Sequence, residues 1–262
     1  ENLILVTGTH TSGKSMISPI VASLEKVEML RKIYYLDQLA TLHFFKEVTF
    51  KTSKFFANHI LDLSYYEQLI GRNMNFRYED ETSVYLSKDP KLYKKRLKIK
   101  RGKNVLKYHK TQKTHMLLDT HNGIWFSNFW LNLGIRNLKI INICRNPIDV
   151  TNSWLNLKLG EIENSILNQI PLISSKNKTK AFYLYKDFNN KGLNKYDLVI
   201  SMVCACIENE IKQYKKIRHI RNLIRIDFDN FAENTKENIS KICSFLKTNK
   251  TIFTKKIMRR EN

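Results

Sequence analysis

The chain is poor in cysteine, proline and glycine, and it has no long apolar run. Its 262 residues include 4 Cys, 4 Pro and 8 Gly, and no segment approaches the roughly eighteen apolar residues of a transmembrane helix. The cysteines lie in apolar segments, so we expect core thiols rather than a disulfide framework. Cys204 and Cys206 stand two apart on an expected helix and face different ways, which argues against a metal site there.

Acidic residues are scarce relative to basic ones. The chain has 45 Lys+Arg against 24 Asp+Glu, a formal net charge of +21. Such an excess attracts polyanions, for example anionic glycans or a multiply charged nucleotide. The basic residues are spread widely apart from one dense run at 91–107, a distribution typical of a solvated surface, and nucleic acid is not the partner we expect. A non-catalytic polyanion-binding protein stays open as an alternative on charge alone.

The length and the ends of the chain limit its organisation. We expect one domain over 1–262, because 262 residues bury a single large core more readily than two. The chain begins at Glu1 rather than Met, so a removed leader or anchor would leave no trace in it. With no transmembrane segment in the sequence, we expect a cytoplasmic protein, of bacterial origin.

The start of the chain joins an apolar strand, a glycine-bounded turn and a helix. Leu3–Val6 leads into Gly8–Ser15, which fits the phosphate-binding pattern G-x-x-x-x-G-K-[ST]. Inward-facing backbone N–H groups, the helix dipole and Lys14 together make a concave site for a phosphate-like anion. We therefore predict a bound anionic nucleotide at this loop.

The remaining pattern predicts a three-layer α/β fold with a central parallel sheet. Apolar residues at helical spacing extend the first helix to about Arg31, and Ile33–Leu36 would be a second strand with Asp37 at its end. Residues 38–113 are mostly amphipathic helix, and we expect this insertion to bind the substrate. Three further strands alternate with helices, an order that implies right-handed parallel crossovers; they are Met116–Asp119, Leu138–Cys144 and Leu223–Phe228.

Local signals also predict where other segments begin. Asn146 can cap a helix whose first position is Pro147, and Asn234 with Glu237 can form a capping box. Residues 158–195 are polar and are expected to be an irregular surface segment.

Two functions compete for the loop, and the first is that of a P-loop kinase or NTPase. Gly8–Ser15 is a complete nucleotide-binding pattern, and the strand that ends in Asp119 could supply a magnesium-binding carboxylate. This alternative requires ATP and magnesium.

The second function rests on the segment from Lys139 to Trp154, where a strand ends in Arg145-Asn146-Pro147 and Ser153 follows eight residues after the arginine. This segment resembles the sulfotransferase family. The resemblance implies that Arg145 and Ser153 hold the 3′-phosphate of the donor 3′-phosphoadenosine 5′-phosphosulfate (PAPS). An arginine at a strand end beside a helix N-terminus is physically suited to a dianionic phosphate.

Three more stretches are similar to the same family. The turn would be its 5′-phosphosulfate loop, with donor-binding residues Gly8, Thr11, Ser12, Gly13, Lys14 and Ser15. Asp119-Thr120-His121 falls where cytosolic members carry Lys-Thr-His, so the resemblance implies His121 as the base. Residues 223–231 and 239–246 resemble the family's late strand and closing helix. Lys14 would stabilise the leaving group, and this chemistry requires no metal.

The sequence also departs from the family. Lys14 lies three residues from the usual loop lysine, whose place Thr11 takes, and Asp119 replaces a lysine. The C-terminal Arg-Lys-Gly element has only positional candidates, namely Lys255, Lys256, Arg259 and Arg260. We predict sulfuryl transfer to a hydroxyl or amine of an unidentified acceptor, with a glycan or another anionic molecule as examples.

Overall fold

A computed structural model describes residues 2–99, 105, 113–159, 172–175, 178–181 and 193–261. Its main sheet has five strands in the order β2-β3-β1-β4-β7, and every pairing in it is parallel. The strands are β1 (Asn2–Thr7), β2 (Val27–Lys32), β3 (His115–Asp119), β4 (Asn137–Cys144) and β7 (Leu223–Asp227). The predicted parallel α/β fold is therefore confirmed.

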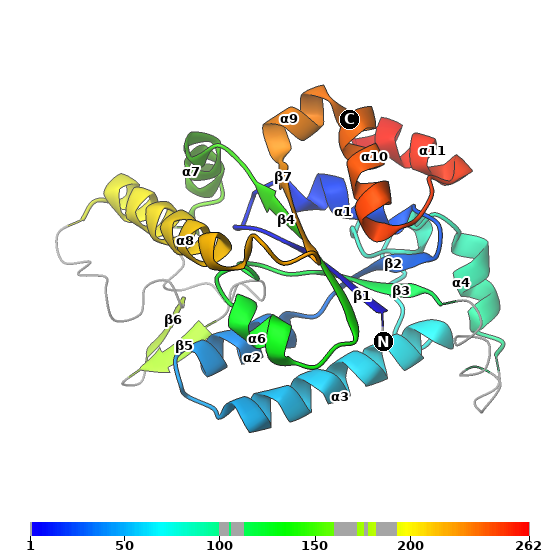
Figure 1. The fold of residues 1–262 in the computed structure, drawn as a ribbon, viewed down its shortest axis with the longest axis horizontal. Coiled ribbons are helices and arrows are strands. Elements are labelled where there is room, and N and C mark those ends of the chain that lie inside the picture. Colours follow the sequence, from blue (N-terminus) through cyan, green and yellow to red (C-terminus); the bar gives the residue numbers. More distant parts are fainter. Residues whose placement is uncertain are drawn as a thin grey trace.

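Helices cover both faces of the sheet and form the outer layers (Figure 1). One side carries α1 (Lys14–Ala22), α9 (Phe228–Glu233), α10 (Thr235–Leu246) and α11 (Ile252–Glu261). The other carries α2 (Tyr34–Phe44), α3 (Phe50–Leu69), α6 (Ser127–Asn132), α7 (Pro147–Asn156) and α8 (Lys195–Ile217). The chain also contains η1 (Val84–Leu86) and α4 (Pro90–Arg96). In the part of 38–113 that the structure describes, these elements are helical, as predicted.

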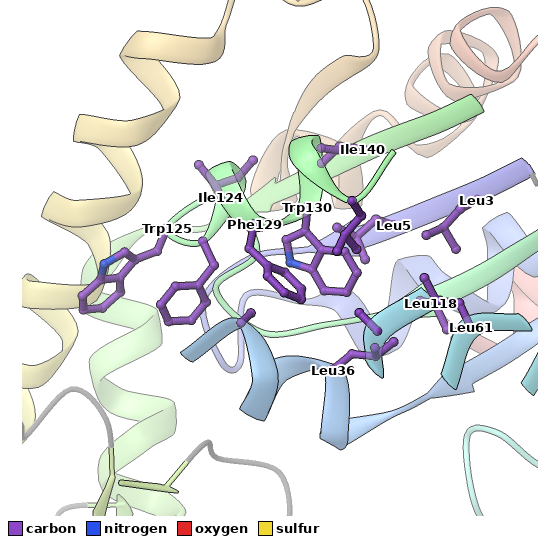
Figure 2. Packing of buried hydrophobic residues seen from close by; sticks show 14 of the residues in the cluster. Leu3, Leu5, Leu36, Leu61, Leu118, Ile124, Trp125, Phe129, Trp130 and Ile140 are labelled. Carbon is purple, nitrogen blue, oxygen red and sulfur yellow. The ribbon is translucent and has the colours of Figure 1, made fainter. Parts of the chain in front are cut away.

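The main core lies between the sheet and α2, α3 and α6 (Figure 2). A strand that is buried on both faces has a nearly continuous apolar sequence, as β1 does. Its Leu3 and Leu5 belong to this core. Trp130, 1% exposed, packs from α6 onto the same face. This packing fixes the carboxyl ends of β1, β3 and β4 along one edge, where ligands bind in open α/β sheets.

The predicted boundary between the first helix and the second strand is wrong. Helix α1 ends at Ala22, and the apolar residues assigned to its last turns form β2 instead. Lys26 has a φ of 57°, a left-handed conformation that a continuing helix does not allow. A short apolar run fits a buried strand as well as a helix stripe, so periodicity alone could not separate them. The segment predicted as strand begins α2, and Asp37 lies in that helix's first turn.

Three smaller expectations are also corrected. Asn234 is the N-cap of α10, but its side chain accepts no cap bond, because the same residue closes α9. Cys204 is exposed on α8, and Cys144, the last residue of β4, is half-buried, although all four thiols are free. Within 158–195 the structure describes an antiparallel pair, β5 (Leu172–Ser175) and β6 (Lys178–Ala181), rather than irregular chain.

Other parts of the sequence behave as expected or fall outside the description. Asn146 caps α7 through its side chain and Pro147 occupies the first turn, as predicted. Residues 100–104, 106 and 107 of the basic run at 91–107 lie outside the described residues, as do 160–171 and 182–192. Within the described ranges, no helix is both long and apolar enough to cross a membrane.

Candidate functional site

The lysine at the end of the loop between β1 and α1 folds back onto the carbonyl oxygens of the loop. The Nζ atom of Lys14 donates hydrogen bonds to the carbonyl oxygens of Gly8, at 3.2 Å, and Thr9, at 2.9 Å. The lysine is 4% exposed, and burial lowers its pKa, although nearby carboxylates partly oppose that effect. Its ammonium therefore lies inside the loop, where it can turn toward an anion.

Two side chains from the α7 region hold the next loop carbonyls. Trp154 Nε1 donates to the His10 oxygen at 3.0 Å, and Arg145 Nη1 donates to the Thr11 oxygen at 3.3 Å. Thr11 has a φ of 63°, so this bond braces a residue in a strained conformation. Carbonyls from Gly8 to Thr11 thus all have donors, and the loop is shaped before any ligand binds.

Gly13 is required at the end of the loop for two reasons. Its φ of 95° disfavours other residues, and an added Cβ would overlap the ring of Phe228. The Arg145 guanidinium lies over the same ring, 5.0 Å from its centroid. Phe228 therefore joins the loop to the strand end that carries Arg145.

Several polar atoms around the loop are buried without a partner. Among the described residues, nothing hydrogen-bonds to Thr11 Oγ1, Ser12 Oγ or Arg145 Nε. Buried polar groups in native proteins nearly always have partners, so such a cluster indicates a place for a polar ligand. Ser15, in contrast, is exposed.

A cavity of about 190 Å³ opens beside this loop, between the end of β4 and helix α8. Glu210 of α8 reaches into the region, where its carboxylate accepts from Thr9 Oγ1 at 3.0 Å and Asn142 Nδ2 at 2.9 Å. Arg225 of β7 lines the same cavity with Arg145. The cavity is thus lined by two guanidinium groups and the hydroxyl of Ser12 together with the Glu210 carboxylate.

His121 lies at the carboxyl end of β3 and faces the loop. It is 7% exposed, and its ring centroid is 4.9 Å from that of His10. Its backbone N–H donates to Asp37 Oδ2 at 3.2 Å, and its Nδ1 is 3.6 Å from the same oxygen. This leaves Nε2 as the ring nitrogen not directed at Asp37.

Burial and positive charge keep both imidazoles neutral. Burial, then the charge of Lys14, hold the pKa of His121 well below 6.5. The same two effects lower the pKa of His10 to about 3. Burial raises the pKa of Asp37, since a charged carboxylate is costly away from water. A neutral imidazole can accept a proton, so His121 has the protonation state that a base needs.

Asp119 is the last residue of β3 and is in register with Lys32 on the neighbouring strand β2. It is 4% exposed and accepts from Ser18 Oγ at 3.4 Å. Burial raises its pKa, while Lys14 and Lys32 act in the opposite direction. In the described part of the chain, no group of three or more His, Cys, Asp or Glu is placed to hold a metal.

The structure brings most predicted site residues together. The loop, Arg145 and His121 meet at one edge of the sheet through the contacts above. Ser153 is half-buried on α7, and in the described residues its side chain has no hydrogen bond to the loop or to Arg145. At the C-terminus, Arg260 donates to the Leu86 oxygen at 3.0 Å, which attaches α11 to η1.

Sequence reasoning missed the residues that support these groups. The sequence predicts Asp37 only as a strand end, and it assigns no site role to Lys32, Glu210, Trp154 or Phe228. Each acts across a long sequence separation, for example 201 residues between Thr9 and Glu210. A local pattern cannot encode such a pairing.

Comparisons with known proteins agree with this architecture. A profile of the sulfotransferase domain matches residues 2–260, whereas no curated protein sequence matches the chain. The structure is similar to the sulfotransferase domain from the curacin biosynthetic pathway, with a TM-score of 0.52 and 10% identity over 97% of this chain and 76% of that one.

Two further solved structures resemble it less closely. A sulfotransferase from Alicyclobacillus acidocaldarius gives a TM-score of 0.45 and 13% identity, over 96% of this chain and 83% of that one. Mouse sulfotransferase SULT7A1 complexed with PAP gives 0.43 and 11%, over 100% and 65%. Because the domain profile spans almost the whole sequence, the chain belongs to the sulfotransferase family.

Proposed function

We propose that the protein transfers a sulfuryl group from PAPS to a hydroxyl or amine of its acceptor, for example a glycan. The observation that carries this proposal is the set of polar atoms at the loop and the end of β4: among the described residues, Thr11 Oγ1, Ser12 Oγ and Arg145 Nε are buried without partners. A phosphosulfate with a nearby 3′-phosphate presents enough oxygens to satisfy all three. The residues Gly8, Gly13, Ser15 and Ser153 complete the proposed donor site.

The reaction needs a base, in-line geometry and positive charge on the leaving oxygen. The acceptor oxygen or nitrogen bonds to sulfur while the bond from sulfur to the 5′-phosphate oxygen breaks, and that electron pair stays on the phosphate. His121 takes the acceptor proton at Nε2, because Nδ1 faces Asp37. Lys14 turns from its loop carbonyls to the leaving oxygen. The donor product is 3′-phosphoadenosine 5′-phosphate (PAP).

The acceptor would approach from the helical insertion at 38–113, within a single domain. Asp37, which accepts from the His121 backbone, lies on α2 one residue before this insertion, and Glu81 within the insertion pairs with Lys32 at 2.6 Å. The insertion therefore borders the reacting groups directly. We propose this insertion as the acceptor-binding region, where it would shape the acceptor site and control the acceptor's access to the reacting groups.

Thermal unfolding with two nucleotides tests the donor. PAP at about a hundredfold above its Kd should add about 2.7 kcal/mol of stability, or roughly 5–10 °C in Tm for a domain of this size. The shift should persist in EDTA and in Asp119→Asn, because no step uses a divalent metal. The kinase alternative, which family membership does not favour, predicts instead that ATP stabilises the protein and that EDTA or Asp119→Asn removes the shift. A shift with ATP that EDTA abolishes would contradict the proposal.

A further inference from the structure

Lys32 is the last residue of β2 and lies at the same edge of the sheet as the loop. It is in register with Asp119 on the neighbouring parallel strand, so the two side chains leave the same face of the sheet. The Lys32 side chain is 18% exposed, and its Nζ is 2.6 Å from Glu81 Oε2. The ammonium is thus held near the reacting groups by one carboxylate of the insertion.

The positive charge of Lys32 changes the pKa values of the residues proposed to take part in the reaction. It lowers the pKa of Lys14 and, as the smallest of the causes, that of His10 and His121. It also opposes the effect of burial on the pKa of Asp119. The strand register places Lys32 beside Asp119, two residues before His121, and the direction of these effects agrees with that placement.

The partners of the neighbouring cations differ from those of Lys32. Lys14 donates to two backbone carbonyls of the loop, and Arg145 donates to a third. Lys32 is instead paired with Glu81, whose side chain is 40% exposed. Partly exposed ion pairs are weak, because water and salt screen them. An incoming anion can therefore replace Glu81 at little cost.

We propose that Lys32 is a further catalytic residue that donates hydrogen bonds to the sulfuryl oxygens of the donor, with Glu81 as the counter-ion it releases. This inference rests on the proposed function and adds a contact to it. Lys32 exchanges no proton: it offsets negative charge on the sulfuryl group while sulfur passes from the phosphate oxygen to the acceptor. A purely structural lysine would instead serve only to neutralise Asp119.

Titration calorimetry with PAPS and PAP, in the absence of acceptor, separates these roles. The two nucleotides carry about the same net charge near pH 8, but only PAPS has the sulfuryl group. Lys32→Met should weaken PAPS about tenfold to a hundredfold, the usual effect of losing one charge-assisted partner, and PAP by less than about threefold. Glu81→Gln is the matched control, and it should leave PAP unchanged and tighten PAPS by up to about fivefold.

A second variant guards against misfolding. Lys32→Met leaves Asp119 with one cation fewer, so the double variant Lys32→Met with Asp119→Asn removes both charges and should show the same loss of PAPS selectivity. Equal losses for PAP and PAPS, or weaker PAPS binding in Glu81→Gln, would overturn the inference alone. A wild-type protein that binds neither nucleotide would overturn the proposed function as well.

Discussion

Arg145 combines two roles that one experiment can separate. It braces the loop through Thr11, at 3.3 Å, and its Nε is buried without a partner among the described residues. Arg145→Ala removes both the brace and the proposed 3′-phosphate contact. Losing one charge-assisted hydrogen bond costs about 1.5–3 kcal/mol, roughly ten- to a hundredfold in affinity. We expect that loss for PAP on top of whatever the loop itself loses.

Comparing PAP with adenosine 5′-phosphate isolates the phosphate contact. Both nucleotides need the loop, so the bracing effect appears in each and cancels in the difference, as in a double-mutant cycle. Calorimetry on wild type and Arg145→Ala should give a coupling of about 1.5–3 kcal/mol. Arg145→Lys keeps the charge but loses the planar fork, so it should fall between them. If Arg145→Ala weakens both nucleotides by the same factor, the 3′-phosphate assignment is refuted.

The remaining expectations concern the base and the fold. With an acceptor that the wild type sulfates, His121→Ala should lower turnover by about two to four orders of magnitude and leave PAP affinity unchanged. Lys14→Ala should lower both turnover and PAP affinity. If His121→Ala keeps near wild-type turnover, His121 is not the base. Because the pKa of His121 is held well below 6.5, turnover should stay level as the pH falls to 6.5 and decline only below pH 6.5. A pH–turnover profile with its midpoint at or above pH 6.5 would contradict this. Glu28 and Arg96 form a buried ion pair at 2.7 Å, so Glu28→Ala should lower the free energy of unfolding, measured with urea, by about 3–5 kcal/mol. The control Glu237→Ala removes an exposed pair with Lys241 and should lower it by less than about 1 kcal/mol. Equal losses in the two variants would disprove the estimate.

The sequence by itself determined the local parts of the site. Gly8, Gly13 and Lys14 specify the loop, because its dihedral angles and charge depend on adjacent residues. Asn146 and Pro147 likewise fix the start of α7 directly after Arg145. Alternating strands and helices were enough to predict a parallel sheet. These features could be predicted because each depends on neighbours in the chain.

Tertiary structure decided which strand ends became neighbours, and therefore which side chains share the site. The strand order places β2 beside β3, and this brings Lys32 into register with Asp119 across 87 residues of sequence. Packing of α2 then sets Asp37 against His121. Where α1 ended and β2 began was also settled by burial on both faces of the sheet, which a short apolar run cannot reveal. Long-range packing creates these contacts, and no local pattern in the sequence contains them.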